Sequence, residues 1–121
     1  GRRDGGLSIL RRAVGDHPRY PPALYALADA LDRTGQGAAG LPHLETAIRI
    51  DRFYPNAYYL KGKLLYEEGR YRDAAEAMQT FLSLWDEEGP HKDAALRVAA
   101  RAGSKQTPPP LGPASPRPPP R

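Results

Sequence analysis

Cysteine is absent from the 121-residue sequence, which excludes disulfide bonds, zinc–thiolate sites and a thiol nucleophile. An apolar run long enough to span a membrane, which takes about 18 residues, is absent as well. Both absences are typical of a protein in a reducing compartment without membrane attachment, and we expect a cytoplasmic location. The chain begins with Gly1 rather than methionine, so it is open whether the sequence is a fragment of a longer protein.

Most of the chain has no surplus of positive or negative charge. The sequence holds 18 basic and 14 acidic residues, but three of the basic ones, Lys105, Arg117 and Arg121, fall in the last 18 positions. Residues 1–103 therefore contain 15 basic and 14 acidic residues, mixed along the chain rather than gathered in a stripe. The net charge of +4 comes mainly from the tail, so we expect no nucleic-acid partner.

Catalytic and metal-binding patterns are also missing. The three histidines lie far apart and follow no metal-ligand spacing such as HExxH: His17, His43 and His91. The string GQGAAG at 35–40 resembles a dinucleotide-binding fingerprint only by its letters, because it lies between two predicted helices rather than after a strand. The sequence therefore predicts no enzymatic activity, no metal site and no cofactor.

What the sequence does contain is an internal repeat with a period of 34 residues. Small residues, leucines and glycines recur at this spacing: Ala28 and Gly62, Leu31 and Leu65, Gly35 and Gly69, Gly40 and Ala74, Leu44 and Met78. The same period, counted backwards, reaches a half-unit with Gly6, Leu10 and Ala13. Because apolar residues follow i, i+3, i+4, i+7 spacing, each unit is predicted to hold two amphipathic helices.

These patterns predict six helices, at about 5–15, 21–34, 41–51, 55–68, 71–84 and 91–102. Small residues where paired helices cross would allow close packing, and Tyr71 and Met78 would fill the opposite grooves. A glycine supplies the positive φ that a tight turn needs. The segment 35–42 holds three glycines and Pro42, so we predict a shortened second helix and a soft spot there.

The repeat resembles the tetratricopeptide repeat (TPR) family over about residues 5–102. The family's slots are held in one unit by Tyr58, Gly62, Leu65, Gly69, Tyr71, Ala74 and Met78, and in the other by Leu24, Leu27, Ala28, Leu31, Gly35, Leu44 and Ala47. Departures include Lys61 in a leucine slot and Gly37 in an aromatic slot. The resemblance implies an all-α fold, a right-handed superhelical array of antiparallel helix hairpins, or α-solenoid. The domain would cover 1–103, with a half-unit at 5–18, units at 21–54 and 55–88, and a terminal helix at 91–102.

In this family the first helix of each unit lines a concave groove, so the resemblance implies a protein-interaction scaffold that binds a peptide or partner helix there. The matching positions are Tyr25, Asp29, Arg33, Tyr59, Lys63, Tyr66, Arg97 and Arg101. Their aromatic and cationic side chains suit a peptide with acidic or aromatic groups. Alternatively, Tyr25 or Tyr66 packs against a neighbouring helix and the charged residues are simply solvated. Asp29 would repel a carboxylate, which argues against the subtype that clamps the C-terminal carboxylate of chaperones.

The last 18 residues, 104–121, hold eight of the 14 prolines and are predicted to be disordered. Pro116, Pro119 and Arg121 fit PxxPxR, a pattern recognised by Src-homology-3 grooves, but such strings arise easily in a sequence rich in proline and arginine, and a plain disordered linker is the favoured interpretation. Two other functions stay open for the chain. It could be a targeting or regulatory segment of a larger enzyme whose catalytic part lies elsewhere, or it could self-associate through the exposed end of helix 5–15.

Overall fold

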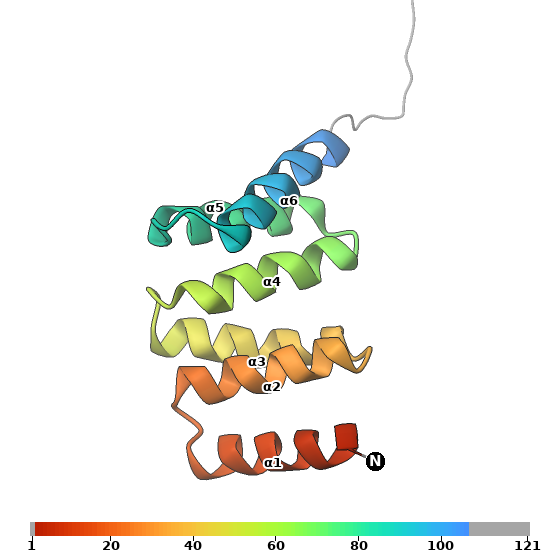
Figure 1. Cartoon of the computed structure of the whole chain (residues 1–121), viewed down its shortest axis with the longest axis vertical. Coiled ribbons are helices and arrows are strands. Elements are labelled where there is room, and N and C mark those ends of the chain that lie inside the picture. Colours follow the sequence, from red (N-terminus) through yellow and green to blue (C-terminus); the bar gives the residue numbers. More distant parts are fainter. Residues whose placement is uncertain (1, 107–121) are drawn as a thin grey trace, which may run out of the picture.

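The computed structural model describes residues 2–106, which form six helices stacked in chain order (Figure 1). They are α1 (Arg2–Asp16), α2 (Pro21–Arg33), α3 (Gly37–Ile50), α4 (Pro55–Glu67), α5 (Tyr71–Leu84) and α6 (Pro90–Gln106). Within this described range there is no strand, and none of the helices is both long and apolar enough to cross a membrane. The predicted all-α array of six helices is confirmed.

The turns inside the two hairpins have the same geometry 34 residues apart. Gly35 has φ +80° and Gly69 has φ +82°, a region that side chains with a Cβ rarely adopt. Just beyond these glycines, the Gln36 N–H donates to the Leu31 carbonyl at 2.7 Å, and the Arg70 N–H donates to the Leu65 carbonyl at 2.9 Å. These bonds satisfy carbonyls at the helix ends, so each glycine ends one helix and redirects the chain into the next.

Close packing within each hairpin depends on a residue without a Cβ. A Cβ on Gly40 of α3 would lie 3.1 Å from the Ala28 Cα of α2, and a Cβ on Gly62 of α4 would lie 2.8 Å from the Met78 Cγ of α5. Both distances are shorter than ordinary contacts, so each glycine lets the opposite helix approach. The predicted role of small residues at the crossings agrees with this geometry, and Met78 does fill the space beside Gly62.

The prediction of a shortened helix after Gly35 is wrong. α3 begins at Gly37 and has 14 residues, the same length as α5, with Pro42 inside it. Packing explains the difference: Gly40, Leu44 and Ala47 of α3 are all buried. Tertiary burial of this face outweighs the backbone hydrogen bond that proline cannot make.

The far end of the chain also differs from expectation. α6 continues to Gln106, past the predicted end at residue 102 and into the first positions assigned to the tail. No proline occurs between Pro90 and Pro108, so nothing in that stretch blocks the helical backbone. The remainder of the predicted tail, with its PxxPxR pattern, lies outside the described residues.

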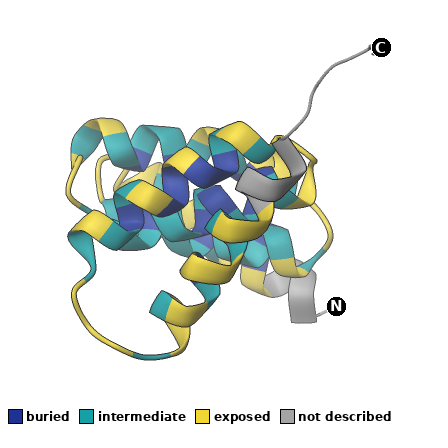
Figure 2. Ribbon diagram, turned by 90° about the horizontal axis from the view of Figure 1, so that it is seen from above, coloured by how far each residue is buried: buried dark blue, intermediate teal, exposed yellow. Residues whose placement is uncertain are grey.

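The six helices form two layers. In the described part of the chain α2 contacts α4 and α4 contacts α6, whereas α1 does not reach α3 and α3 does not reach α5. The even-numbered helices therefore form a close-packed inner layer, and the odd-numbered helices spread apart on the outside. Figure 2 shows the buried residues where the layers face each other and exposed residues on the outside and in the loops.

Candidate interaction surface

The inner layer carries all eight residues predicted to contact a partner. They come from its three helices: Tyr25, Asp29 and Arg33 from α2, Tyr59, Lys63 and Tyr66 from α4, and Arg97 and Arg101 from α6. Within a helix most of them are four residues apart, a spacing that puts side chains on one face. Their structural surroundings differ, and their role in binding stays a prediction.

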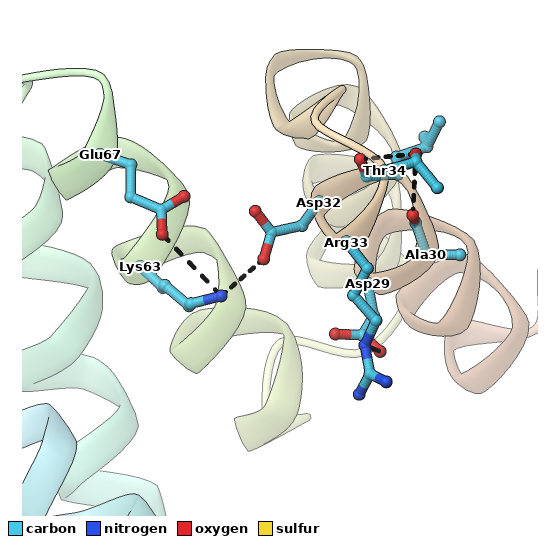
Figure 3. Close-up of polar contacts among 8 residues, drawn as sticks. Asp29, Ala30, Asp32, Arg33, Thr34, Lys63 and Glu67 are labelled. Carbon is cyan, nitrogen blue, oxygen red and sulfur yellow. Dashed lines mark hydrogen bonds and ion pairs between the residues drawn. The ribbon is translucent and has the colours of Figure 1, made fainter. Parts of the chain in front are cut away.

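Lys63 bridges the two repeats of the inner layer. Its Nζ lies 2.6 Å from an Asp32 carboxylate oxygen of α2 and 3.9 Å from a Glu67 carboxylate oxygen of its own helix (Figure 3). The bond with Asp32 raises the pKa of Lys63, while burial and then the Asp32 charge raise the pKa of Glu67. Asp32 is only 11% exposed and Lys63 is 43% exposed, so the ammonium group is held within the protein yet still faces solvent.

On α2 the predicted pair of charges neutralises itself. The Arg33 Nε lies 3.0 Å from an Asp29 carboxylate oxygen, across one helical turn (Figure 3). Asp29 also raises the pKa of Tyr25, after the larger effect of burial. The α2 part of the surface therefore combines a half-buried tyrosine with a closed ion pair and offers little net charge to a ligand.

Aromatic rings extend across the first halves of α2 and α4. The rings of Tyr25 and Tyr54 meet edge to face with centroids 6.3 Å apart. Burial raises the pKa of Tyr54, and Tyr20 is among the neighbours that raise it further. Tyr20 is 56% exposed, and Phe53 beside Tyr54 is 71% exposed. We call Tyr20, Tyr25, Phe53, Tyr54 and Tyr59 the aromatic stripe.

Tyr59 joins three helices. Its ring centroid lies 5.2 Å from that of Phe81 on α5 and 5.1 Å from that of His91 on α6. Trp85 stacks on Phe81 at 5.5 Å and also approaches His91, so the rings form one continuous cluster. Tyr59 therefore holds the α4, α5 and α6 helices together in addition to facing the surface.

Tyr66 packs against another side chain of the protein, whereas the two predicted arginines of α6 are exposed. Tyr66 packs edge to face against Tyr71 of α5, with centroids 5.3 Å apart, so this tyrosine follows the packing alternative. Arg97 and Arg101 are exposed and form no ion pair with any other residue in the described range. They are the cations of the predicted set that remain available to an acidic ligand.

The sequence interpretation missed several contributors to this surface. Asp32 could not be singled out because its partner Lys63 lies 31 positions away. Tyr20 and Tyr54 had a usable signal, since they lie one 34-residue period apart, each directly before a helix that begins with proline. His91, assigned no role from spacing alone, takes part in the aromatic cluster around Tyr59.

The outer layer contains a polar cleft between α3 and α5, with a volume of about 360 Å³. Lys61 lies in its wall and pairs with Glu45 at 3.0 Å, while Leu27, the residue one period earlier, is buried. Because a lysine occupies position 61 in place of the family's leucine, a polar gap remains between the outer helices. It contains closed ion pairs, including Arg70 with Asp73 at 3.0 Å.

The arrangement of helices in this chain is similar to that of several solved structures. The TPR domain of P58(IPK) superposes with a TM-score of 0.79 at 24% identity, covering 88% of this chain and 29% of that chain. The Sgt2 TPR domain from Aspergillus fumigatus gives 0.75 at 20% identity, with coverages of 93% and 78%. The first TPR of Spaghetti (RPAP3), bound to the HSP90 peptide SRMEEVD, gives 0.75 at 16% identity, with coverages of 85% and 82%. These likenesses show a shared fold.

Comparison with sequences agrees with the structural likeness. No curated protein matches the chain at a significant level. The tetratricopeptide repeat family, in contrast, matches residues 1–64, more than half of the sequence, and a second family of the same description matches residues 59–105. Together with the glycine-centred hairpins repeated every 34 residues, these matches establish that the chain belongs to the tetratricopeptide repeat family.

Proposed function

We propose that this chain is a non-catalytic protein-interaction module that binds an extended peptide along its inner layer. The observation that carries the proposal is the row of aromatic and cationic side chains shared by α2, α4 and α6. Rigid tyrosine rings lose little conformational entropy on binding, and arginine recognises carboxylates with two parallel hydrogen bonds. A structural relative of this fold, the first TPR of RPAP3, is bound to a peptide, which supports the same class of partner here.

The charges on the inner layer set the polarity of the ligand. Asp29 and Arg33 neutralise each other on α2, and Lys63 is shared between Asp32 and Glu67 on α4. The unpaired cations are those of α6, described above. We therefore propose that acidic groups of the peptide lie over α6 and apolar or aromatic groups lie over Tyr25 and Tyr59. A terminal carboxylate over α2 would meet Asp29, so a carboxylate clamp there is not proposed.

A paired-variant experiment tests this proposal. The full chain would be used to select peptides from a random displayed library, and the affinities of the selected peptides would be measured by isothermal titration calorimetry. Arg97→Gln/Arg101→Gln should weaken binding of acidic peptides by tenfold or more, since each charge-assisted bond contributes about 1.5–3 kcal/mol. The control Arg52→Gln/Arg72→Gln removes the same charge from exposed positions on other elements. Equal affinity of both variants, or selection of basic peptides, would contradict the proposal.

Self-association is a second candidate, favoured by the exposed side of α1. Ile9 is 70% exposed, and an apolar cavity of about 310 Å³ between α1 and α2 is lined by Gly6, Leu7, Leu10 and Ala30 among others. Such a surface suits another helix. Sedimentation velocity over a wide concentration range tests this candidate: a single monomeric species at the highest concentration removes it, whereas a dimer that Ile9→Ser abolishes supports it.

A further inference from the structure

Two residues of the aromatic stripe, Tyr20 and Phe53, are among the most exposed large apolar side chains of the described residues. Tyr20 and Phe53 lie on the α1–α2 and α3–α4 loops, one repeat apart, and present 56% and 71% of their surface to solvent. The rings of Tyr25 on α2 and Tyr54 directly before α4 meet edge to face. Exposed aromatic side chains at the same end of two stacked repeats suit the docking of another chain.

The chemistry of the stripe fits a proline-rich segment. Proline rings in the polyproline II conformation pack against aromatic faces, and the segment's backbone carbonyls, which make no internal hydrogen bonds, accept from tyrosine hydroxyls. A carboxylate borders the stripe at the α3–α4 loop, where Asp51 accepts a hydrogen bond from the Phe53 N–H at 3.0 Å. The carboxylate of Asp29 on α2 is already paired with Arg33. The Asp51 carboxylate suits an arginine interspersed among the prolines.

We propose that the aromatic stripe is the docking surface for residues 107–121 of this same chain. The segment reads TPPPLGPASPRPPPR, which contains eight prolines, two arginines and no acidic residue. Its composition thus matches the aromatic rings and the Asp51 carboxylate. The proposal deepens the proposed function, on which it rests, because Tyr25 and Tyr59 belong to both surfaces. An incoming peptide therefore competes with the tail for the same rings.

The distances permit this contact within one molecule. α6 runs in the same direction as α4, and the described chain ends at Gln106, at the far end of α6 from the stripe (Figure 1). The 17 residues of α6 extend about 25 Å, and neighbouring helix axes lie about 10 Å apart. A 15-residue polyproline II segment spans about 46 Å, which exceeds the return path to Tyr59. Tethering at this length gives an effective concentration of about a millimolar, enough to populate a weak contact.

The absence of cysteine makes the proposal directly testable in the full chain. A nitroxide spin label on Ser115→Cys would be the single labelled site, and its paramagnetic broadening of backbone amide signals would report which surface the tail visits. Residues 20, 25, 53, 54 and 59 should lose most of their signal intensity, while Glu76 and Thr80 on α5 keep theirs. Tyr20→Ser/Phe53→Ser in the labelled chain should restore the intensities. Ile9→Ser, which removes an equally exposed apolar side chain from α1, should not.

Three outcomes would overturn the proposal: broadening no greater on the stripe than on α5, broadening unaffected by the Tyr20→Ser/Phe53→Ser change, or broadening of an unlabelled ¹⁵N chain mixed with a labelled ¹⁴N chain. The last result would assign the contact to a second copy. The readout requires no partner, so the tail proposal can fail while peptide binding to the inner layer succeeds. Loss of peptide binding would in turn leave the broadening pattern in place.

Discussion

The contact between Gly62 of α4 and Met78 of α5 gives a prediction whose size can be worked out from the structure. A Cβ added to Gly62 would lie 2.8, 2.9 and 3.0 Å from the Cγ, Sδ and Cε atoms of Met78. Atoms of this kind essentially never come so close, so Gly62→Ala forces the Met78 side chain to move. Met78 is buried, and its new rotamer must fit among Phe81 and Ala95.

Two opposing contributions set the magnitude. Replacing glycine by alanine in the middle of a helix stabilises a protein by about 1 kcal/mol. Overpacking a filled interface costs about 1–3 kcal/mol, and the flexibility of methionine places the cost in the lower half of that range. We therefore expect Gly62→Ala to lower the free energy of unfolding by about 0.5 kcal/mol in the wild-type background. In a Met78→Ala background the collision is gone, and the same change should raise the free energy by about 1 kcal/mol.

A double-mutant cycle measured by urea denaturation and far-ultraviolet circular dichroism tests this prediction. Met78→Ala alone removes about 2–5 kcal/mol, so all four proteins would be compared at one fixed sucrose concentration, which favours the folded state. The expected coupling energy is about 1.5 kcal/mol. If Gly62→Ala has the same effect in both backgrounds, the two residues do not limit the approach of α4 and α5, and our account of the hairpin fails.

Three further changes probe other contacts. Lys61→Leu should raise the free energy of unfolding in urea denaturation by about 0.5–1 kcal/mol, because the leucine side chain fills the outer cleft. The ion pair with Glu45 that this change removes contributes only about 0.2–1 kcal/mol. The control Lys61→Ala does not fill the cleft and should not stabilise the fold. Glu67→Gln should raise stability at pH 7 by about 0.3 kcal/mol after allowance for solvent screening at its half-exposed side chain. The raised pKa of Glu67 means that its ionised form is disfavoured in the folded state, so the advantage should vanish below the unfolded pKa of 4.5, and a constant difference between pH 3.5 and 7 would contradict this. Tyr59→Ala should lower the free energy of unfolding in urea denaturation by about 2–3 kcal/mol, because the contacts with Phe81 and His91 are lost, whereas Tyr59→Phe should be nearly neutral.

The turns and helix crossings of the hairpins could be predicted from individual residues, because each depends on the residue type at one position. Gly35 and Gly69 end helices through positive φ, which depends on the residue type itself. Gly40 and Gly62 were predicted at the crossings because a small residue there recurs with the period. Their partners at the contact, Ala28 and Met78, follow from the same register. A repeat thus predicts its own packing from neighbour to neighbour.

Local propensity failed where burial opposed it. Pro42 and the nearby glycines indicate a weak helix start, yet α3 forms from Gly37 because its face packs on α2. Propensities amount to about 1 kcal/mol for glycine and about 3 for proline, whereas burying one leucine contributes about 1.5–3 kcal/mol. Several buried residues therefore outweigh one proline. Pattern reasoning that treats each helix alone cannot weigh these contributions.

The positions of the candidate surface residues on α2, α4 and α6 could be predicted from the sequence, but the side-chain contacts that these residues make could not. The inner-layer row was implied by the resemblance to the family, in which the first helix of each unit lines the groove. The engagement of Lys63 by Asp32, of Tyr25 by Tyr54 and of Tyr59 by His91 depends on how one unit stacks on the next. These contacts change how the surface should be tested. Substituting Lys63 or Tyr59 perturbs stacking as well as binding, and the exposed arginines of α6 are the cleaner probes.

The central claim is that partners bind the inner layer, and the most direct test is an amide chemical-shift map of the full chain titrated with a library-selected acidic peptide. Our account predicts that the largest shifts fall on the inner faces of α2, α4 and α6, around residues 25, 29, 59, 63, 97 and 101. It also predicts that Arg97→Gln/Arg101→Gln abolishes the shifts on α6. Shifts confined to the outer cleft, around Glu45, Asp73 and Glu76, would contradict it.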